Sequence, residues 1–477
     1  MAILLLASFM NLIDVTIVNV AIPSMQTNLG ASSSQIEWVI AAFVLAFALG
    51  LLPFGRLGDI VGRRRMFLIG VALFTLGSFL CGIAPTMGLL IAARAFQGLA
   101  GAMMTPQVLA IAQVIFPPKE RGFAFSLFGL SAGLASVAGP LVGGSLIAAN
   151  VFGLDWRPIF LVNIPVGLLA LVAGGALIIK VPPHPGLRND YVGILIFGAA
   201  MLLLVYPLIE GRAYGWPAWA FAMMAAAVLL AALFFRWERR QEAAGRTQLL
   251  PFALLTNRNF LLGGLITTFF ASGVPGFFLV FSIFLQSGFG LTPLQSGLTG
   301  VPFSIGVVVA SLTSGRFGSH YLPQRFAAGA LLLAVGFAIT RWTIGNVTGH
   351  VAQFSFTLPL AIAGIGLGTA FAALFQMILA GVPHKDAGSG SGALQALQQL
   401  GAALGVAICG EIFFTWLEQG QGEATTGAAF VGAATAATIY VVLVFVAVAA
   451  IVPLLRPLPR PPAGAPQREP APATIEV

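Results

Sequence analysis

The sequence has 477 residues, of which 58% are hydrophobic and 8% charged, and its mean hydropathy is +0.97. A soluble domain carries about 25% charged residues, so this composition cannot cover a water-facing surface and excludes a soluble enzyme. The net charge of +8 comes from basic residues scattered among apolar runs, which argues against nucleic acid binding. Cys81 and Cys409 lie in apolar runs and provide neither a disulfide framework nor metal-ligand spacing. An all-α integral membrane protein remains.

The apolar runs follow one another along the whole chain. A membrane-crossing helix needs roughly 20 apolar residues, and these runs are too long for membrane strands. In chain order the fourteen runs, each an expected helix, cover 2–23, 37–55, 66–84, 88–115, 122–149, 157–180, 191–210, 216–235, 259–285, 295–314, 325–344, 354–381, 388–416 and 429–455. Pro275, Pro302 and Pro359 are expected to kink these helices rather than end them.

The basic residues indicate the orientation of the helices. If the amino end is cytoplasmic, 19 of the 23 Lys and Arg residues fall in cytoplasmic segments, Arg94 lies inside a membrane span, and only Arg157, Arg212 and Arg341 fall in outer segments. Cytoplasmic loops are enriched in Lys and Arg, so we expect an even number of helices and both termini in the cytoplasm. The amino end lacks the features of a signal peptide. Because the first run begins so near Met1, we expect a cytoplasmic leader to be missing.

Two stretches of the first half recur in the second half. Residues 55–59 match 315–319 at an offset of 260. The residues that match at an offset of 266 are Lys119 and Glu120 with Lys385 and Asp386, Gly139 with Gly405, and Gly144 with Gly410. We therefore predict two related six-helix bundles (1–180 and 259–455), joined by two inserted helices with a cytoplasmic linker (181–258) and followed by a disordered tail (456–477). The alternative is chance similarity between small-residue helices.

Several motifs resemble those of one transporter family. Residues 11–23 (NLIDVTIVNVAIP) resemble the first-helix signature of the fourteen-span drug:proton antiporter branch of the major facilitator superfamily. The other motifs that are similar to the family's are 55–65 between helices 2 and 3, 94–98 in helix 4, 129–144 in helix 5 and 156–165 at the start of helix 6. The resemblance covers the whole chain and implies a major facilitator fold. Ser319 replaces an acid in the second copy of the cytoplasmic motif, so only the first copy should carry the full charge network.

Asp14 and Arg94 are the candidate proton-coupling residues. Asp14 lies roughly 9 residues from the outer end of its run, about 13 Å deep at 1.5 Å per residue. A lone carboxylate there must be protonated, paired or facing water. Burial favours its neutral form and a nearby cation its charged form, so a carboxyl group held between the two can load and release a proton. Arg94 lies about 9 Å deep and can reach it if the helices are neighbours. The alternative is a static ion pair that fixes packing.

Three further polar residues are candidates for substrate binding or coupling. Glu411 is a second intramembrane acid and offers a counter-charge to a cationic substrate. The alternative is a solvated position near the outer boundary of the membrane. Gln97 and Asn19 belong to the same motifs as Arg94 and Asp14 and are candidates through the resemblance.

The cytoplasmic motif concentrates charge in one short loop. Its residues are Gly55, Arg56, Gly58, Asp59, Gly62, Arg63 and Arg64. The glycines allow a tight turn and a close approach of helix ends. In the family that the motif resembles, such a loop locks the two bundles in the outward-facing state through charge pairs and a helix end, which implies a gating role for Asp59. The alternative is a basic topology anchor.

The helix-5 motif contains many small residues and one proline. The members are Gly129, Gly133, Gly139, Pro140, Gly143 and Gly144. The spacing of Gly129, Gly133, Gly139 and Gly143 gives one smooth helix face, which lets a neighbouring helix approach closely. Pro140 adds a bend. Ordinary packing explains this pattern, and the resemblance implies in addition a seal against proton leak.

The sequence excludes ATP as the energy source. None of Lys119, Lys180 and Lys385 follows a glycine, so no P-loop of the usual form exists, and the four histidines lie in separate loops without metal-ligand spacing. We expect no cofactor, no metal and no enzyme activity, but a proton gradient that drives export of a lipophilic or cationic small molecule across the bacterial inner membrane. Alternatives are a symporter or facilitator for a small metabolite, and a non-transporting sensor. The sequence leaves open whether a periplasmic adaptor and an outer-membrane channel take part.

Overall fold

A computed structural model describes residues 1–31, 33–179, 190–211, 214–314, 321–383, 386–420 and 426–455, and all regular secondary structure in these residues is helical. The tail 456–477 and the second motif copy 315–319 lie outside them. The helices of the first bundle are α1 (Ala2–Leu29), α2 (Ser33–Val61), α3 (Arg63–Gly82), α4 (Met87–Ile115), α5 (Pro118–Ala148), α6 (Pro158–Leu161) and α7 (Asn163–Leu177).

The remaining helices form an inserted group and a second bundle. The inserted helices are α8 (Tyr191–Glu210), α9 (Ala218–Ala243) and the short α10 (Phe252–Thr256). The second bundle consists of α11 (Arg258–Ile283), α12 (Pro293–Ser314), α13 (Leu322–Gly345), α14 (Thr357–Leu379), α15 (Ala387–Gly420) and α16 (Thr426–Ile451). As predicted, Pro275 and Pro302 lie inside helices and do not end them.

The helices are long and apolar because their residues face lipid or one another. Among the described residues, 12 helices are long and apolar enough to cross a membrane, with α6 and α7 forming one of these spans (Pro158–Leu177). In α1 and α5 the described apolar stretches, Ala2–Val18 and Phe123–Ala135, are shorter because other side chains of these two helices lie outside those described. A multi-pass membrane fold is therefore established, and the full count of fourteen spans stays a prediction.

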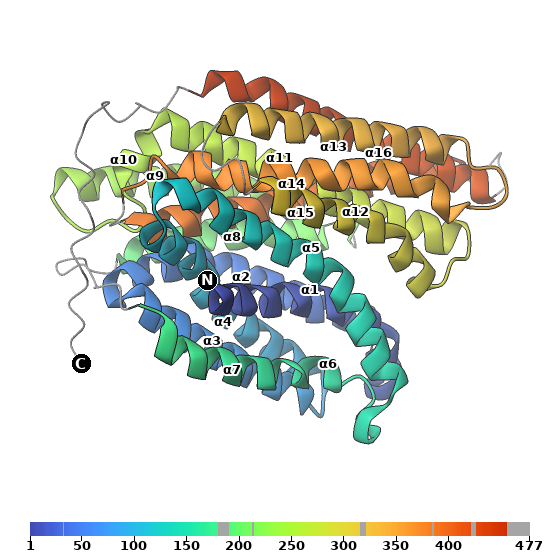
Figure 1. Cartoon of the computed structure of the whole chain (residues 1–477), viewed down its shortest axis with the longest axis horizontal. Helices are drawn as coiled ribbons and strands as arrows, with labels where there is room; N and C mark the ends of the chain where they lie inside the picture. The colour runs from blue at the N-terminus through green and yellow to red at the C-terminus, as the bar shows by residue number, and fades with distance from the viewer. Residues whose placement is uncertain are drawn as a thin grey trace.

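The two bundles repeat the same packing. In the first bundle α1 packs against α5, α2 against α4, and α3 against α4 and α7. In the second bundle α11 packs against α15, α12 against α14, and α13 against α14 and α16. Between the bundles, α2 contacts α15 and α5 contacts α12, so each contact is the counterpart of the other. Figure 1 shows the first bundle, in blue to green, beside the second bundle in yellow-green to red.

The inserted helices lie along the junction of the bundles. Helix α8 packs against α9 and also contacts α2 and α15, one helix from each bundle. Asp190 caps α8 by accepting a hydrogen bond from the Gly193 amide at 2.8 Å, and its other oxygen accepts one from the Trp237 indole of α9 at 2.8 Å. The pair is therefore fixed at one end by a single carboxylate.

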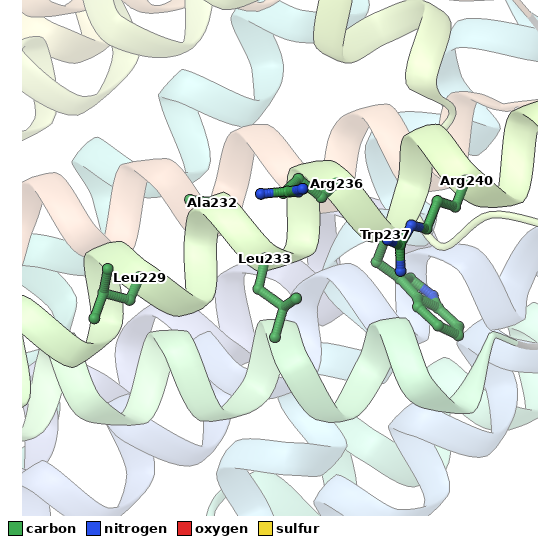
Figure 2. Close-up of a pocket in the computed structure, with 6 residues that line it drawn as sticks. All are labelled: Leu229, Ala232, Leu233, Arg236, Trp237 and Arg240. Atoms are coloured by element: carbon green, nitrogen blue, oxygen red, sulfur yellow. The ribbon is translucent and has the colours of Figure 1, made fainter.

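A hollow of about 350 Å³ lies along the outer side of α9 (Figure 2). Its lining residues are Leu229, Ala232, Leu233, Arg236, Trp237 and Arg240. All of them come from one helix that is mostly exposed, as expected where a helix faces lipid. The hollow is remote in the fold from the bundle interiors, and we assign no site to it.

Candidate functional site

The structure brings Asp14 and Arg94 together inside the first bundle. Asp14 of α1 is 0% exposed and Arg94 of α4 is 1% exposed. The Arg94 Nη1 donates to Asp14 Oδ2 at 2.5 Å, which makes a buried ion pair. The sequence-derived depths placed the two groups within reach, and the contact shows that their helices face each other. The carboxyl group neither contacts lipid nor lies at the molecular surface.

The other carboxylate oxygen of Asp14 accepts two amide hydrogen bonds. Gln97 Nε2 donates to Asp14 Oδ1 at 2.9 Å, and Asn163 Nδ2 of α7 donates to the same oxygen at 3.0 Å. Both amides also donate to Ser78 Oγ of α3, at 2.8 and 3.2 Å. Each partner is at most 2% exposed. Four helices therefore converge on one carboxylate.

The guanidinium of Arg94 is fixed independently of Asp14. Its Nε donates to the Val39 carbonyl of α2 at 3.1 Å, and Nη1 donates to Gln97 Oε1 at 2.7 Å. The ring of Phe43 lies 4.2 Å from the guanidinium carbon and that of Phe160 lies 5.7 Å away, in cation–π range. A buried cation is tolerated only with such partners. Arg94 therefore provides a fixed positive charge against which the charge of Asp14 can change.

Three members of this cluster were not predicted individually from the sequence: Asn163, Ser78 and the Val39 carbonyl. Asn163 appeared only inside a motif and Ser78 not at all, because uncharged polar residues in an apolar run carry no signal of their own. Gln97, a predicted candidate, belongs to the cluster. The side chain of Asn19 lies outside those described.

A second polar cluster joins the two bundles at the end where α2 passes into α3. Asp59 accepts hydrogen bonds from the Gly388 and Ser389 amides at the start of α15, both at 3.1 Å, and from the Ser389 hydroxyl at 3.3 Å. Arg63 donates to Asp59 Oδ1 at 2.9 Å within the first bundle. Asp59 thus sits at the positive end of a helix that belongs to the other bundle.

A second ion pair spans the same boundary. Arg56 Nη1 donates to Asp386 Oδ1 at 3.3 Å, and both side chains are less than 10% exposed. We call Asp59, Arg63, Gly388 and Ser389, together with the Arg56–Asp386 pair, the latch. Beyond the latch, Gln113 Nε2 donates to the Leu379 carbonyl at 2.6 Å and so joins the bundles again.

The glycines of the cytoplasmic motif allow this close approach. A methyl group added to Gly55 would overlap the Gly388 carbonyl oxygen, and one added to Gly58 would overlap the side chain of Gln107. Gly62 has φ 101°, a backbone conformation that favours glycine, and it separates α2 from α3. Arg64 instead donates to the Gly175 carbonyl of its own bundle and takes no part in the latch.

The small-residue face of α5 contacts helices from both bundles. Methyl groups added at Gly129 and Gly133 would meet Ser311 and Val307 of α12 in the second bundle. Two further glycines of the motif pack against α1. A methyl group added to Gly139 would overlap Thr16, and one added to Gly143 would overlap Ile17. Gly144 is half-buried, and the side chain of Pro140 lies outside those described.

Glu411 lies apart from the Asp14 cluster. It is on the exposed side of α15, where its Oε2 accepts a hydrogen bond from the Trp216 indole at 2.8 Å. Trp216 belongs to the connection between α8 and α9. Glu411 is therefore exposed and is not part of the buried charge cluster around Asp14.

Comparison with known proteins agrees with this architecture. The family model described as Major Facilitator Superfamily matches residues 4–190 and 184–406. A probable actinorhodin transporter of Streptomyces coelicolor is 39% identical over 447 residues, which are 91% of this chain and 77% of that protein. The tetracenomycin C resistance and export protein of Streptomyces glaucescens is 31% identical over 83% of this chain and 72% of its own length. The puromycin resistance protein of Streptomyces alboniger is 33% identical over 86% and 80%.

Solved structures show the same fold at low sequence identity. The human organic anion transporter MFSD10 superposes with a TM-score of 0.65 and 14% identity over 94% of this chain and 98% of its own. The proton:xylose symporter XylE superposes with a TM-score of 0.60 and 13% identity over 92% and 94%. The family model and the sequence relatives show that the chain belongs to the Major Facilitator Superfamily of membrane transporters, and the repeated packing of the two bundles agrees with this.

Proposed function

We propose that this protein is a secondary active exporter that exchanges protons for lipophilic compounds, cationic ones among them. Three relatives with at least 31% identity bear names that refer to transport of, or resistance to, antibiotics: actinorhodin, tetracenomycin C and puromycin. These names support a small molecule of that kind as the substrate. No cofactor is required, because the proton gradient supplies the energy.

The buried Asp14–Arg94 pair is the observation that carries the proposal. A carboxylate with 0% exposure is stable only while its charge is compensated. Uptake of a proton removes that charge and weakens the hydrogen bonds to Asp14, so the packing of the helices around Asp14 must respond. Asp14 and Arg94, with Gln97, thus form the proton-coupling site.

The latch supports alternating access. The excess of Lys and Arg in the segments expected to be cytoplasmic supports a latch on the cytoplasmic side and both termini in the cytoplasm. We assign α1 and α5 as spans, which gives the fourteen helices of the antiporter branch in a bacterial inner membrane. The latch then closes the inner side, and its release permits the inward-facing state.

The test measures the direction of proton movement. Purified protein is reconstituted into liposomes that hold a pH-sensitive dye, with puromycin and ethidium as probes. In liposomes where the cytoplasmic side of the protein faces outward, we expect addition of either probe to the outside to release protons from the lumen. Asp14→Asn should abolish that release while the protein remains folded. Proton entry together with the probe would indicate a symporter instead. Exchange that persists in Asp14→Asn would remove Asp14 from the mechanism.

A further inference from the structure

The two amides that bind Asp14 close a ring of hydrogen bonds. The ring runs from Asp14 Oδ1 to Gln97 Nε2, then to Ser78 Oγ, then to Asn163 Nδ2 and back to Asp14 Oδ1. Its four bonds measure 2.9, 2.8, 3.2 and 3.0 Å in this order. It links α1, α4, α3 and α7 through one oxygen of a single carboxylate.

A count of hydrogens shows which form of Asp14 the ring suits. A side-chain amide nitrogen carries two hydrogens, and both nitrogens use one on Asp14 and one on Ser78. Arg94 occupies the other carboxylate oxygen. An ionised carboxylate only accepts hydrogen bonds, so three donors aimed at Asp14 are matched to the charged form.

A proton bound to Asp14 removes the negative charge that strengthens all three hydrogen bonds, so the partner that is held least firmly is the first to withdraw. Arg94 is also fixed by the Val39 carbonyl and by two aromatic rings. Gln97 is oriented by Arg94 and by the Cys81 thiol, which lies 3.6 Å from its Oε1. Among the described residues, the side chain of Asn163 has one other hydrogen-bond partner, Ser78, in the longest bond of the ring. Asn163 is therefore the donor that is held least firmly.

Asn163 also lies where the helical hydrogen bonding of α6 and α7 is weakened, although the backbone of Val162 between them stays helical (φ −60°, ψ −25°). Helix α6 ends at Leu161 and α7 begins at Asn163, with Val162 between them. Pro165 has no N–H to donate to the Leu161 carbonyl, so one helical hydrogen bond across this point is missing. The start of α7 can thus shift with less cost than the middle of a continuous helix.

We propose that Asn163 is a positioning residue that senses the charge of Asp14, and that proton uptake releases Asn163 and with it the start of α7 from α1 and α3. The role deepens the proposed function and rests on it, since it presupposes that Asp14 binds the transported proton. Asn163 acts on the proton only through Asp14, whereas Arg94 and Gln97 remain in place as the fixed part of the cluster.

The other charged groups around Asp14 are few. Among the described side chains, Arg94 of α4 and the Cys81 thiol of α3 face it, while α6 and α7 contain no charged residue. The charges nearest along α5 and α3 are Arg121 and Arg65, about 20 Å from the level of the pair at 1.5 Å per residue. Arg56 and Asp59 of α2 lie farther from Val39, about 25 Å. The side chain of Glu37, two residues before Val39, is not among those described.

The experiment follows protonation of Asp14 without any substrate. Infrared difference spectra of the full-length protein in nanodiscs, recorded across the physiological pH range, give the carbonyl stretch of each protonated carboxyl group. The band that Asp14→Asn removes belongs to Asp14. In Asn163→Leu the ionised form loses one donor. We therefore expect the midpoint, the pH at which this band reaches half of its full intensity, to move to higher pH by about one to two units. Ser78→Ala, which loosens both amides, should move it in the same direction by less.

Thr75→Val is the matched control. Thr75 lies in the same contact between α3 and α7, where it faces Gly167, but its hydroxyl donates to the Val71 carbonyl and not to the ring. We expect an unchanged midpoint. Accessibility of a cysteine introduced at Val166 should rise with protonation in the wild type, and should be high at every pH in Asn163→Leu.

The outcomes separate this inference from the function on which it rests. If Asp14 titrates but its midpoint is the same in Asn163→Leu and Ser78→Ala as in the wild type, Asn163 has a structural role only and the inference is wrong, while the exporter proposal stands. If no band disappears in Asp14→Asn, Asp14 takes up no proton in this range, and both proposals fail. A midpoint that shifts equally in Thr75→Val would show a general effect of loosened packing and would also overturn the inference.

Discussion

Asp59 in the first bundle accepts hydrogen bonds from both the backbone amide and the hydroxyl of Ser389 in the second, at 3.1 and 3.3 Å. The partner helix α15 begins only two residues earlier, at Ala387. The unpaired amides of a helix start and the helix dipole both favour an anion there. One carboxylate therefore holds the start of a helix from the opposite half of the molecule.

Asp59→Asn should weaken the latch. The variant keeps an acceptor oxygen but loses the charge, and hydrogen bonds to a charged group contribute about 1.5–3 kcal/mol each. We expect the population in which the bundles part at this end to rise about tenfold or more. Distances between spin labels at positions 65 and 381, one in each bundle, report the change in a variant without native cysteines.

Arg64→Gln is the control for that experiment. Arg64 lies in the same segment, but it bonds to its own bundle through the Gly175 carbonyl. Its loss should leave the distance distribution as in the wild type. An equal shift in both variants would attribute the effect to a general disturbance of this segment rather than to the latch.

Arg94→Ala should destabilise the folded protein by about 3–5 kcal/mol, because it leaves Asp14 buried and uncompensated. The double variant Asp14→Asn with Arg94→Gln removes both charges and should recover most of the loss. Thermal unfolding in detergent, followed by tryptophan fluorescence, measures the two effects. A double variant no more stable than Arg94→Ala would contradict the assignment of the cost to the stranded carboxylate.

Gly55→Ala should have the same consequence as Asp59→Asn through sterics. The added methyl group would overlap the Gly388 carbonyl, which cannot withdraw without separating α2 from α15. We expect longer distances between the same spin labels and reduced export of puromycin. Gly198→Ala on α8 meets nothing within 4 Å and should leave both readouts unchanged; a comparable loss there would point to helix propensity instead.

Gly139→Ala should separate α5 from α1. The new methyl group would overlap Thr16, whose Oγ1 also donates to the Ala135 carbonyl at 3.1 Å. Overpacking of this kind costs about 1–3 kcal/mol, and Thr16→Ala in the same chain should return part of it. Unfolding temperatures of the single and double variants test this, and proton leak into empty liposomes tests the sealing role. If liposomes with Gly139→Ala leak no more protons than liposomes with the wild type, the glycine face has a packing role alone.

Glu411→Gln tests whether the exposed acid binds substrate. Since Glu411 is bonded to Trp216, we expect the KM for ethidium export to change less than about twofold and the stability to fall by about 1 kcal/mol. Trp216→Phe removes the same bond from the other side and should give the same loss of stability. A KM that rises for ethidium but not for an uncharged probe would instead assign the counter-charge to Glu411.

Hydrophobic run length predicted the helices closely. The run 191–210 coincides with α8 (Tyr191–Glu210), and the run 66–84 differs from α3 (Arg63–Gly82) by one turn or less. The larger differences occur where polar residues continue a helix past the apolar run, as in α2, which extends to Val61 beyond the predicted end at 55. Run length measures the apolar core of a helix and not the polar turns that follow it.

The candidate site was only partly predictable. The charges of Asp14 and Arg94 stand out in apolar runs, and their depths are similar. The pairing of Arg56 with Asp386 joins residues 330 positions apart, and no local pattern encodes it. Asn163, Ser78 and the Val39 carbonyl become functional only through the packing of their helices, which the sequence does not specify on its own.

The enclosure of Asp14 within one bundle keeps the proposed proton-binding group apart from the exported compound. With 0% exposure, its carboxyl group cannot be touched by a molecule the size of an antibiotic in this state. If Asp14 binds the transported proton as proposed, the proton and the exported compound do not compete for the same atoms, and each affects the other only through movement of helices. Substitutions in the wall between the bundles can then widen or narrow the range of exported compounds without altering how the ion is used.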